Sequence, residues 1–139
     1  METTIKQTEK NKQIIRELYL ECLNKRKWDL LGEIIDENYE GPVPGKGPMA
    51  FEAAVTNILE AFPGLQFTIQ DLLAEDDKVV VRWQWEAINE NPFRGFPASG
   101  KKASINGIAI FEFEEDKIIR SWLQNEKLEL MKQIGAISF

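Results

Sequence analysis

The side chains that could carry out chemistry are notable for what is missing, because the 139-residue chain contains no histidine. Histidine is the commonest general base near neutral pH, the commonest zinc ligand and the usual activator of a serine or cysteine nucleophile. Cys22 is the only cysteine, so it can form no internal disulfide and has no imidazole to activate its thiol. We expect Cys22 to pack as a small apolar side chain, as in a protein of the reducing cytoplasm.

One carboxylate could replace the missing base. Strand alternation places Asp71 on the same face as Phe67, Ile69 and Leu73, and a carboxyl group buried there would suit the role of general base. Two other interpretations remain open, since Asp71 could lie at the solvated end of its strand or be held by a backbone amide of the turn at 75–77. Asp71 is nevertheless the catalytic candidate that the pattern favours.

Other polar residues allow two interpretations each. Glu126 begins the last helical pattern, where a carboxylate meets the positive end of a helix, so we prefer a capping role to proton transfer. Tyr19 either points its hydroxyl into a pocket or packs in the core with its tip at the surface. Asn89, Asn106 and Asn125 can form hydrogen bonds but have no acid or base capacity.

The elements that position these residues follow from apolar periodicity. Spacings of three and four predict helices over 8–24, 28–39 and 51–62, the last ended by Pro63-Gly64. After residue 64 the period becomes two, which predicts strands over 65–73, 79–86, 103–113 and 118–125 and a final short helix over 126–135. We therefore predict an α+β fold in which three N-terminal helices cover a strongly curved, mainly antiparallel sheet.

Composition limits the partners. The net charge of −6 would repel nucleic acid, and we find neither an apolar run long enough for a membrane span nor an export signal. The length fits one domain over 1–139, with a flexible N-terminus over about 1–7. We expect a soluble cytoplasmic protein that binds neither nucleic acid nor membranes.

Short sequences along most of the chain resemble the SnoaL-like polyketide cyclases of the nuclear transport factor 2-like superfamily. Each is weak alone, but their order and spacing together are specific. They are Leu18-Tyr19, Trp28-Asp29, the segment 61–65 (AFPGL), the turn 71–77 (DLLAEDD), 79–83 (VVVRW), 93–100 (FRGFPASG), 107–111 (GIAIF), 116–118 (DKI), Ser121-Trp122 and 128–135 (LELMKQIG).

This resemblance implies a cone-shaped barrel of one curved sheet and three helices around a deep pocket, often paired into a homodimer through the outer face of the sheet. Family cyclases use an aspartate and a histidine, without a cofactor, to close a ring in a flat polycyclic ester. Here those positions hold Leu123 and Ala109, and Asn89 stands where the pattern has another histidine. The resemblance therefore implies the pocket without its usual acid and base.

We predict a pocket lined mainly by carbon that takes a small apolar or aromatic molecule and holds neither metal nor cofactor. Trp83 and Trp85 either form its walls or belong to the core or dimer interface. Two functions stay open. The first is a pocket protein that acts as a cofactor-independent cyclase or isomerase on an apolar or aromatic carbonyl compound. The second is a non-catalytic ligand-binding or dimeric interaction module. The predicted lining is Tyr19, Trp83, Trp85, Asn89, Gly107, Ala109, Phe111, Ser121, Leu123 and Asn125.

Overall fold

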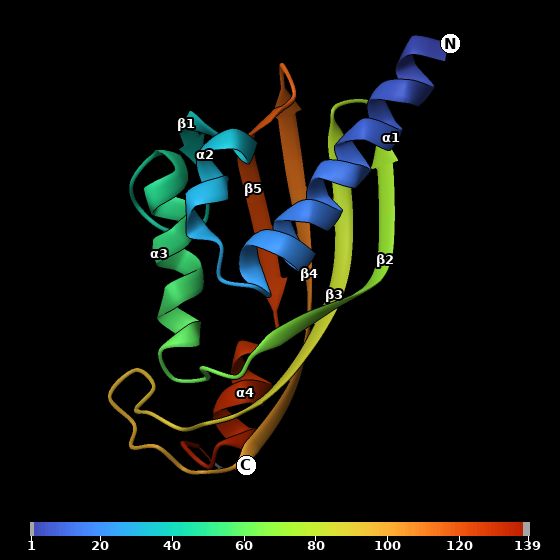
Figure 1. Cartoon of the computed structure of the whole chain (residues 1–139). Coiled ribbons are helices and arrows are strands. Elements are labelled where there is room, and N and C mark those ends of the chain that lie inside the picture. Colours follow the sequence, from blue (N-terminus) through green and yellow to red (C-terminus); the bar gives the residue numbers. More distant parts are fainter. Residues whose placement is uncertain (1, 138–139) are drawn as a thin grey trace.

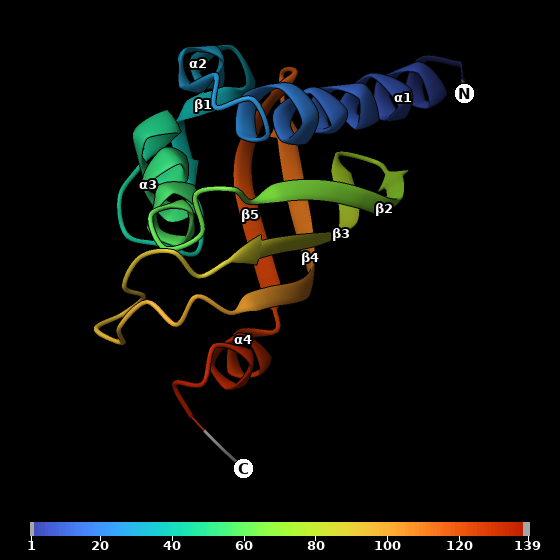
Figure 2. The same ribbon diagram turned by 60° about the horizontal axis from the view of Figure 1, so that its bottom comes forward.

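The computed structural model describes residues 2–137 and consists of helices packed on one face of a curled five-stranded sheet (Figure 1). The sheet order is β1-β5-β4-β3-β2. β1 lies parallel to β5, whereas the other neighbours are antiparallel. The sheet curls without closing into the predicted barrel (Figure 2). The strands are β1 Ile35–Glu40, β2 Gln66–Glu75, β3 Lys78–Ile88, β4 Lys102–Glu114 and β5 Lys117–Asn125.

Helical segments lie in all three of the predicted N-terminal regions. Helix α1 (Glu2–Glu17) begins earlier than the periodicity indicated, and it crosses over the sheet, while α3 (Gly47–Leu59) lies beside β1 (Figures 1 and 2). Between them lie a 3-10 turn at Trp28–Leu30 and the short α2 at Leu31–Ile34. Helix α4 (Lys127–Gln133) follows the last strand and packs against β4.

Helix α1 continues into a π-helical segment, Leu18–Leu23 (η1). Its wider turn is defined by hydrogen bonds that span five residues, from Asn24 N to Tyr19 O (2.9 Å) and from Lys27 N to Cys22 O (2.8 Å). Such turns insert one residue into the helical repeat and are frequent at functional sites. Here the segment keeps four of its six side chains buried, Tyr19 among them.

The helix predicted over 28–39 is wrong in its second half, where the chain forms strand β1. Ile35 and Tyr39 are both buried, and their spacing of four fits one face of a helix and one face of a strand equally well. Pairing with β5 in parallel decides for the strand. The choice therefore depends on residues about 80 positions away, which local periodicity does not contain.

A bulge in β2 changes which residues face inward. Ile69 pairs with Trp83, but Asp71 pairs with Arg82, so Gln70 is an extra residue in the register. Because a shift of one residue exchanges the two faces of a strand, Asp71 and Leu73 point outward. The predicted burial of Asp71 is therefore wrong.

The core fills the space between the helices and the concave face of the sheet. The side chains of Ile15, Leu18, Phe62 and Ile118 are fully buried there. At one end of the sheet, the turn between β4 and β5 is tied to α1, since Asp116 accepts hydrogen bonds from Lys10 Nζ (2.7 Å) and Gln7 Nε2 (2.9 Å). Over the described residues, no helix is long and apolar enough to cross a membrane.

Candidate functional site

A cavity of about 420 Å³ opens between η1, α3 and the concave face of β3, β4 and β5. Pockets of this size and apolar character hold small organic molecules in other proteins. The structure brings most of the predicted lining together around it. The predicted residues that line it are Tyr19, Trp83, Trp85, Ala109, Phe111, Ser121, Leu123 and Asn125.

Four aromatic rings in the cavity wall contact one another edge to face. The Tyr19 ring lies 5.1 Å from Phe67 and 6.1 Å from Phe111, measured between centroids. The Phe67 ring in turn lies 5.1 Å from Trp83. Edge-to-face contacts hold aromatic side chains in defined orientations, so two neighbouring rings fix the Tyr19 side chain.

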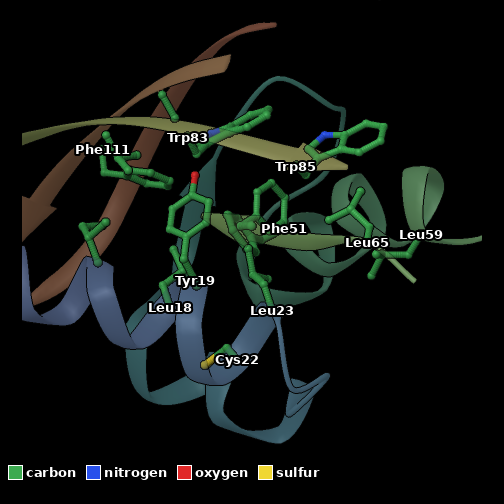
Figure 3. Close-up of a cluster of buried hydrophobic side chains, with 14 of the residues drawn as sticks. Leu18, Tyr19, Cys22, Leu23, Phe51, Leu59, Leu65, Trp83, Trp85 and Phe111 are labelled. Carbon is green, nitrogen blue, oxygen red and sulfur yellow. The ribbon is translucent and has the colours of Figure 1, made fainter. Parts of the chain in front are cut away.

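Two polar atoms face each other within this aromatic cluster. Figure 3 shows the Tyr19 hydroxyl, on η1, pointing toward the indole nitrogen of Trp83 on β3. Trp83 Nε1 is buried and has no hydrogen-bond partner among the described residues. Burial raises the pKa of Tyr19 far above its ordinary value, an effect that the nearby indole N–H opposes and the second phenol, Tyr39, adds to. Tyr19 is therefore a neutral hydroxyl at physiological pH.

Gly107 makes room for Trp83. The two residues are opposite each other in the β3–β4 register, and a Cβ atom at position 107 would collide with the six-membered ring of the indole. The indole therefore lies directly over the backbone of β4. Gly107 was predicted to line the cavity, but it lies outside the lining, and its contribution is the space it leaves for Trp83.

The second tyrosine of the cavity has its hydroxyl engaged. Tyr39 Oη and Ser121 Oγ are 2.6 Å apart in a buried hydrogen bond between β1 and β5. A Cβ at Gly41 would collide with this hydroxyl, so the absence of a side chain there lets the pair form. Burial raises the pKa of Tyr39, and the hydrogen bond from Ser121 opposes the rise. Each hydroxyl of the pair therefore has a hydrogen-bond partner within the wall.

Ala109 and Leu123, which stand where the resemblance placed a histidine and an aspartate, are directly opposite each other in the β4–β5 register. Both line the cavity, Ala109 buried and Leu123 partly exposed. Neither side chain carries a transferable proton. This part of the cavity is an apolar surface.

The charged residues of the lining, Glu60, Arg94, Glu126 and Lys127, are all exposed. Glu126 is at the N-cap position of α4, as predicted, but its side chain makes no capping hydrogen bond to the helix. Instead Glu126 Oε1 accepts hydrogen bonds from the backbone N–H of Asn106 (2.7 Å) and from its side-chain amide (3.2 Å). Glu126 thereby ties the start of α4 to β4.

Asn89 is fully buried but lies outside the cavity lining. Its side-chain oxygen accepts a hydrogen bond from Ser99 N (2.8 Å), and its amide donates to Asn91 O (2.8 Å). The backbone of Asn89 also pairs with Lys101 and Gly100. Asn89 closes the base of the long β3–β4 loop, so its role is structural.

Asp71 is on the opposite face of the sheet from the cavity. It forms an exposed ion pair with Arg82, with 2.6 Å between Nε and Oδ2. Cys22 is buried in η1 as expected, and burial, with smaller contributions from Glu17 and other acidic residues nearby, raises its pKa to about 11. Within residues 2–137 no group of histidine, cysteine, aspartate and glutamate side chains could hold a metal ion.

Several lining residues lie outside the predicted set. Tyr39 belongs to the region interpreted as a helix. Phe51, Val55 and Ile58 belong to the predicted helix 51–62, whose apolar spacing was used only to predict the helix. Phe67 shares its face of β2 with Ile69, and an inward position was predicted for it, but only as a neighbour of Asp71. Periodicity identifies buried positions without distinguishing a filled core from a cavity wall.

The chain matches a protein-family model and several solved structures. The model of the SnoaL-like polyketide cyclase family matches residues 13–134. Among solved structures, TsrD from Streptomyces laurentii has 27% identity and a TM-score of 0.84 over 93% of this chain and 97% of that one.

Two further structures show the same fold. AclR from Streptomyces galilaeus has 18% identity and a TM-score of 0.82, with 94% of this chain and 99% of that one covered. A SnoaL-like polyketide cyclase from Agrobacterium tumefaciens has 24% identity and a TM-score of 0.75, with 87% and 95% covered. Comparison with curated protein sequences gives no match.

Proposed function

The chain belongs to the SnoaL-like polyketide cyclase family, and we propose that it binds a small, flat, apolar or aromatic carbonyl compound in the cavity described above. The observation that carries the proposal is the cavity of about 420 Å³ with aromatic and aliphatic walls. Burial of apolar ligand surface in such a site supplies affinity, and a few polar groups supply orientation.

The lining favours binding over the proton transfers of the family cyclases. Ala109 and Leu123 face each other where an acid and a base would be needed. The two buried phenols, Tyr19 and Tyr39, are neutral because burial raises the pKa of both. A reaction in this cavity therefore has hydrogen-bond donors available in its interior but no base of ordinary strength.

A matched pair of substitutions in α3 tests the proposal. Ala54 lines the cavity, whereas its neighbour Ala53 is exposed. With fluorene as the probe, titrations followed by tryptophan fluorescence are expected to show equal affinity for wild type and Ala53→Phe. Ala54→Phe places a ring in the cavity and is expected to lower the affinity at least about tenfold.

Two results would contradict the proposal. One is equal fluorene affinity in Ala54→Phe and Ala53→Phe, which would locate binding elsewhere. The other is an absence of binding by wild type to fluorene and to a panel of other flat polycyclic compounds. Far-ultraviolet circular dichroism of both variants checks that each keeps the fold.

We also propose that two copies pair through the outer face of the sheet. An apolar row crosses four strands there, because Leu73 is opposite Val80, Val80 opposite Ile110, and Ile110 opposite Trp122. Leu73 is 66% exposed and Trp122 is 44% exposed in the single chain. A row of this kind can be buried by an identical row related by two-fold symmetry.

Light scattering after size exclusion tests the pairing. The expected mass is twice the 16.0 kDa of one chain. Leu73→Lys is expected to give the single-chain mass, whereas Leu20→Lys, on the helical side of the molecule, leaves the dimer intact. A single-chain mass for wild type at all concentrations would overturn the dimer.

A further inference from the structure

The indole N–H of Trp83 is a buried hydrogen-bond donor in the cavity wall that has no acceptor among the described residues. Leaving a buried N–H without an acceptor costs on the order of 1–3 kcal/mol, so native structures rarely retain one without a reason. The side chain is 4% exposed and lines the cavity, so the reason is to be found there.

The phenolic oxygen of Tyr19 faces this indole N–H, but the two do not form a hydrogen bond. The phenolic proton adds a second donor. An indole nitrogen donates but never accepts, so Tyr19 cannot direct its own proton to Trp83. Even where the indole N–H approaches the phenolic oxygen, the phenolic proton still needs an acceptor elsewhere. The other cavity hydroxyls, Tyr39 and Ser121, are occupied with each other at 2.6 Å. Tyr19 and Trp83 therefore place two hydrogen-bond donors side by side in the cavity wall, and no neighbouring side chain there is free to accept from both.

We infer that Tyr19 Oη–H and Trp83 Nε1–H together bind one carbonyl oxygen of the ligand. A carbonyl oxygen has two lone pairs and can accept from both donors at once. The rings of Phe67 and Phe111 contact Tyr19 edge to face, so the surroundings of the donors are apolar. The inference rests on the proposed function and specifies where in the cavity the oxygen lies.

The same surroundings select a neutral carbonyl over a carboxylate. The cations of the lining, Arg94 and Lys127, are exposed, and the whole chain carries a net charge of −6. A carboxylate buried beside two neutral donors would lose its hydration without gaining a counter-ion. A ketone or quinone oxygen loses much less on entering the site.

A pair of ligands that differ only in the oxygen tests the inference. 9-Fluorenone and fluorene have nearly the same shape, but only fluorenone carries a carbonyl group. Wild-type protein is expected to bind fluorenone about tenfold or more tightly than fluorene, as two hydrogen bonds would give. In Tyr19→Phe the ratio of the two affinities is expected to fall to about threefold, because one of the two donors is lost.

Infrared spectroscopy of bound fluorenone supplies a readout independent of affinity. The carbonyl stretch is expected at lower frequency in wild type than in an apolar solvent, and Tyr19→Phe is expected to reverse part of the shift. Trp83→Phe removes the other donor and is expected to reverse the remainder. Should that variant unfold, wild type and Tyr19→Phe still decide the question.

The outcomes separate the two proposals. Equal affinities for fluorenone and fluorene in wild type, with an unshifted carbonyl stretch, would overturn the donor site and leave the pocket function standing. Failure of both compounds to bind would overturn the pocket function, and the donor site with it. A preference for fluorenone that survives unchanged in Tyr19→Phe would also overturn the assignment to this pair.

Discussion

The chain has two tyrosines, and both lie in the cavity wall with opposite hydrogen-bonding states. The Tyr39 hydroxyl is hydrogen-bonded to Ser121 and so has a partner without a ligand. Tyr19 faces an indole N–H that has no partner. Each region contains a glycine whose missing side chain makes the arrangement possible, Gly41 beside Tyr39 and Gly107 beneath Trp83. A satisfied polar pair is part of the wall, whereas an unsatisfied pair is a place for a ligand.

The largest expected effect comes from closing the space under Trp83. Gly107→Val would force the indole off the strand, and we expect a loss of about 3 kcal/mol in the free energy of unfolding, with loss of fluorenone binding. Urea denaturation measures the first and a fluorescence titration the second. Gly32→Ala serves as the control, since a Cβ there meets nothing within 4 Å and helical alanine is favoured over glycine. Unchanged stability in Gly107→Val would contradict the packing described.

Removing each tyrosine hydroxyl in turn measures how much each one contributes to the free energy of unfolding. Tyr39→Phe leaves buried Ser121 without its partner, and we expect a loss of about 1–2 kcal/mol in unfolding free energy. Tyr19→Phe removes a hydroxyl whose loss leaves no acceptor unpaired, and the expected change is about 0.5 kcal/mol or less. Urea denaturation of both variants measures the difference. Equal losses in the two variants would show that the hydroxyls have equivalent surroundings.

Alkaline titration tests the burial of both phenols. Burial raises the pKa of each above the ordinary value of 10.0, so the folded state holds these protons more tightly than the unfolded state. The stability they contribute is complete below pH 10 and is lost as the pH rises above it. Tyrosinate absorbance should therefore appear only as the protein unfolds. A rise in absorbance near pH 10 in folded protein would contradict the burial.

Cys22 adds a second, independent loss of folding stability at alkaline pH. Burial raises its pKa from 9.0 to about 11, so its contribution to stability is complete below pH 9 and lost between pH 9 and 11. Urea midpoints measured from pH 8 upward are expected to fall from pH 9 in wild type. In Cys22→Ala the fall should begin only near pH 10, where the tyrosines of the unfolded state titrate. Identical profiles in both proteins would contradict the assignment.

The smallest expected effect is at Asp71. Its ion pair with Arg82 is exposed, with more than half of the carboxylate side chain accessible to solvent, and such pairs contribute little. Asp71→Asn is expected to change the unfolding free energy by about 0.5 kcal/mol or less and to leave fluorenone affinity unchanged. Loss of binding in this variant, with the fold intact, would place a function on the outer face.

Local periodicity was enough to predict the four long strands, the helices on one face and the inward direction of Trp83 and Trp85. It failed at β1, because a parallel partner distant in sequence decides the conformation of 35–40. It also failed at Asp71, because one extra residue at position 70 exchanges the faces of β2. Bulges and long-range pairing leave little local trace in a sequence.

The candidate site was likewise predictable only in part. Strand alternation was enough to predict Ala109, Phe111, Ser121 and Leu123 as neighbours. The donor pair was not predictable, because whether Trp83 has a hydrogen-bond partner depends on atoms contributed by η1, β2 and β4 together. Satisfaction of a buried polar group is a property of the folded surroundings.

The most direct test of the account is the nuclear magnetic resonance signal of the Trp83 indole N–H. The chain has four tryptophans, and the signal that disappears in Trp83→Phe identifies the one of interest. On addition of fluorenone, we expect a downfield shift of this indole proton that fluorene does not produce, because only fluorenone accepts the hydrogen bond. A Trp83 signal that stays in place at saturating fluorenone, while other indole signals move, would contradict it.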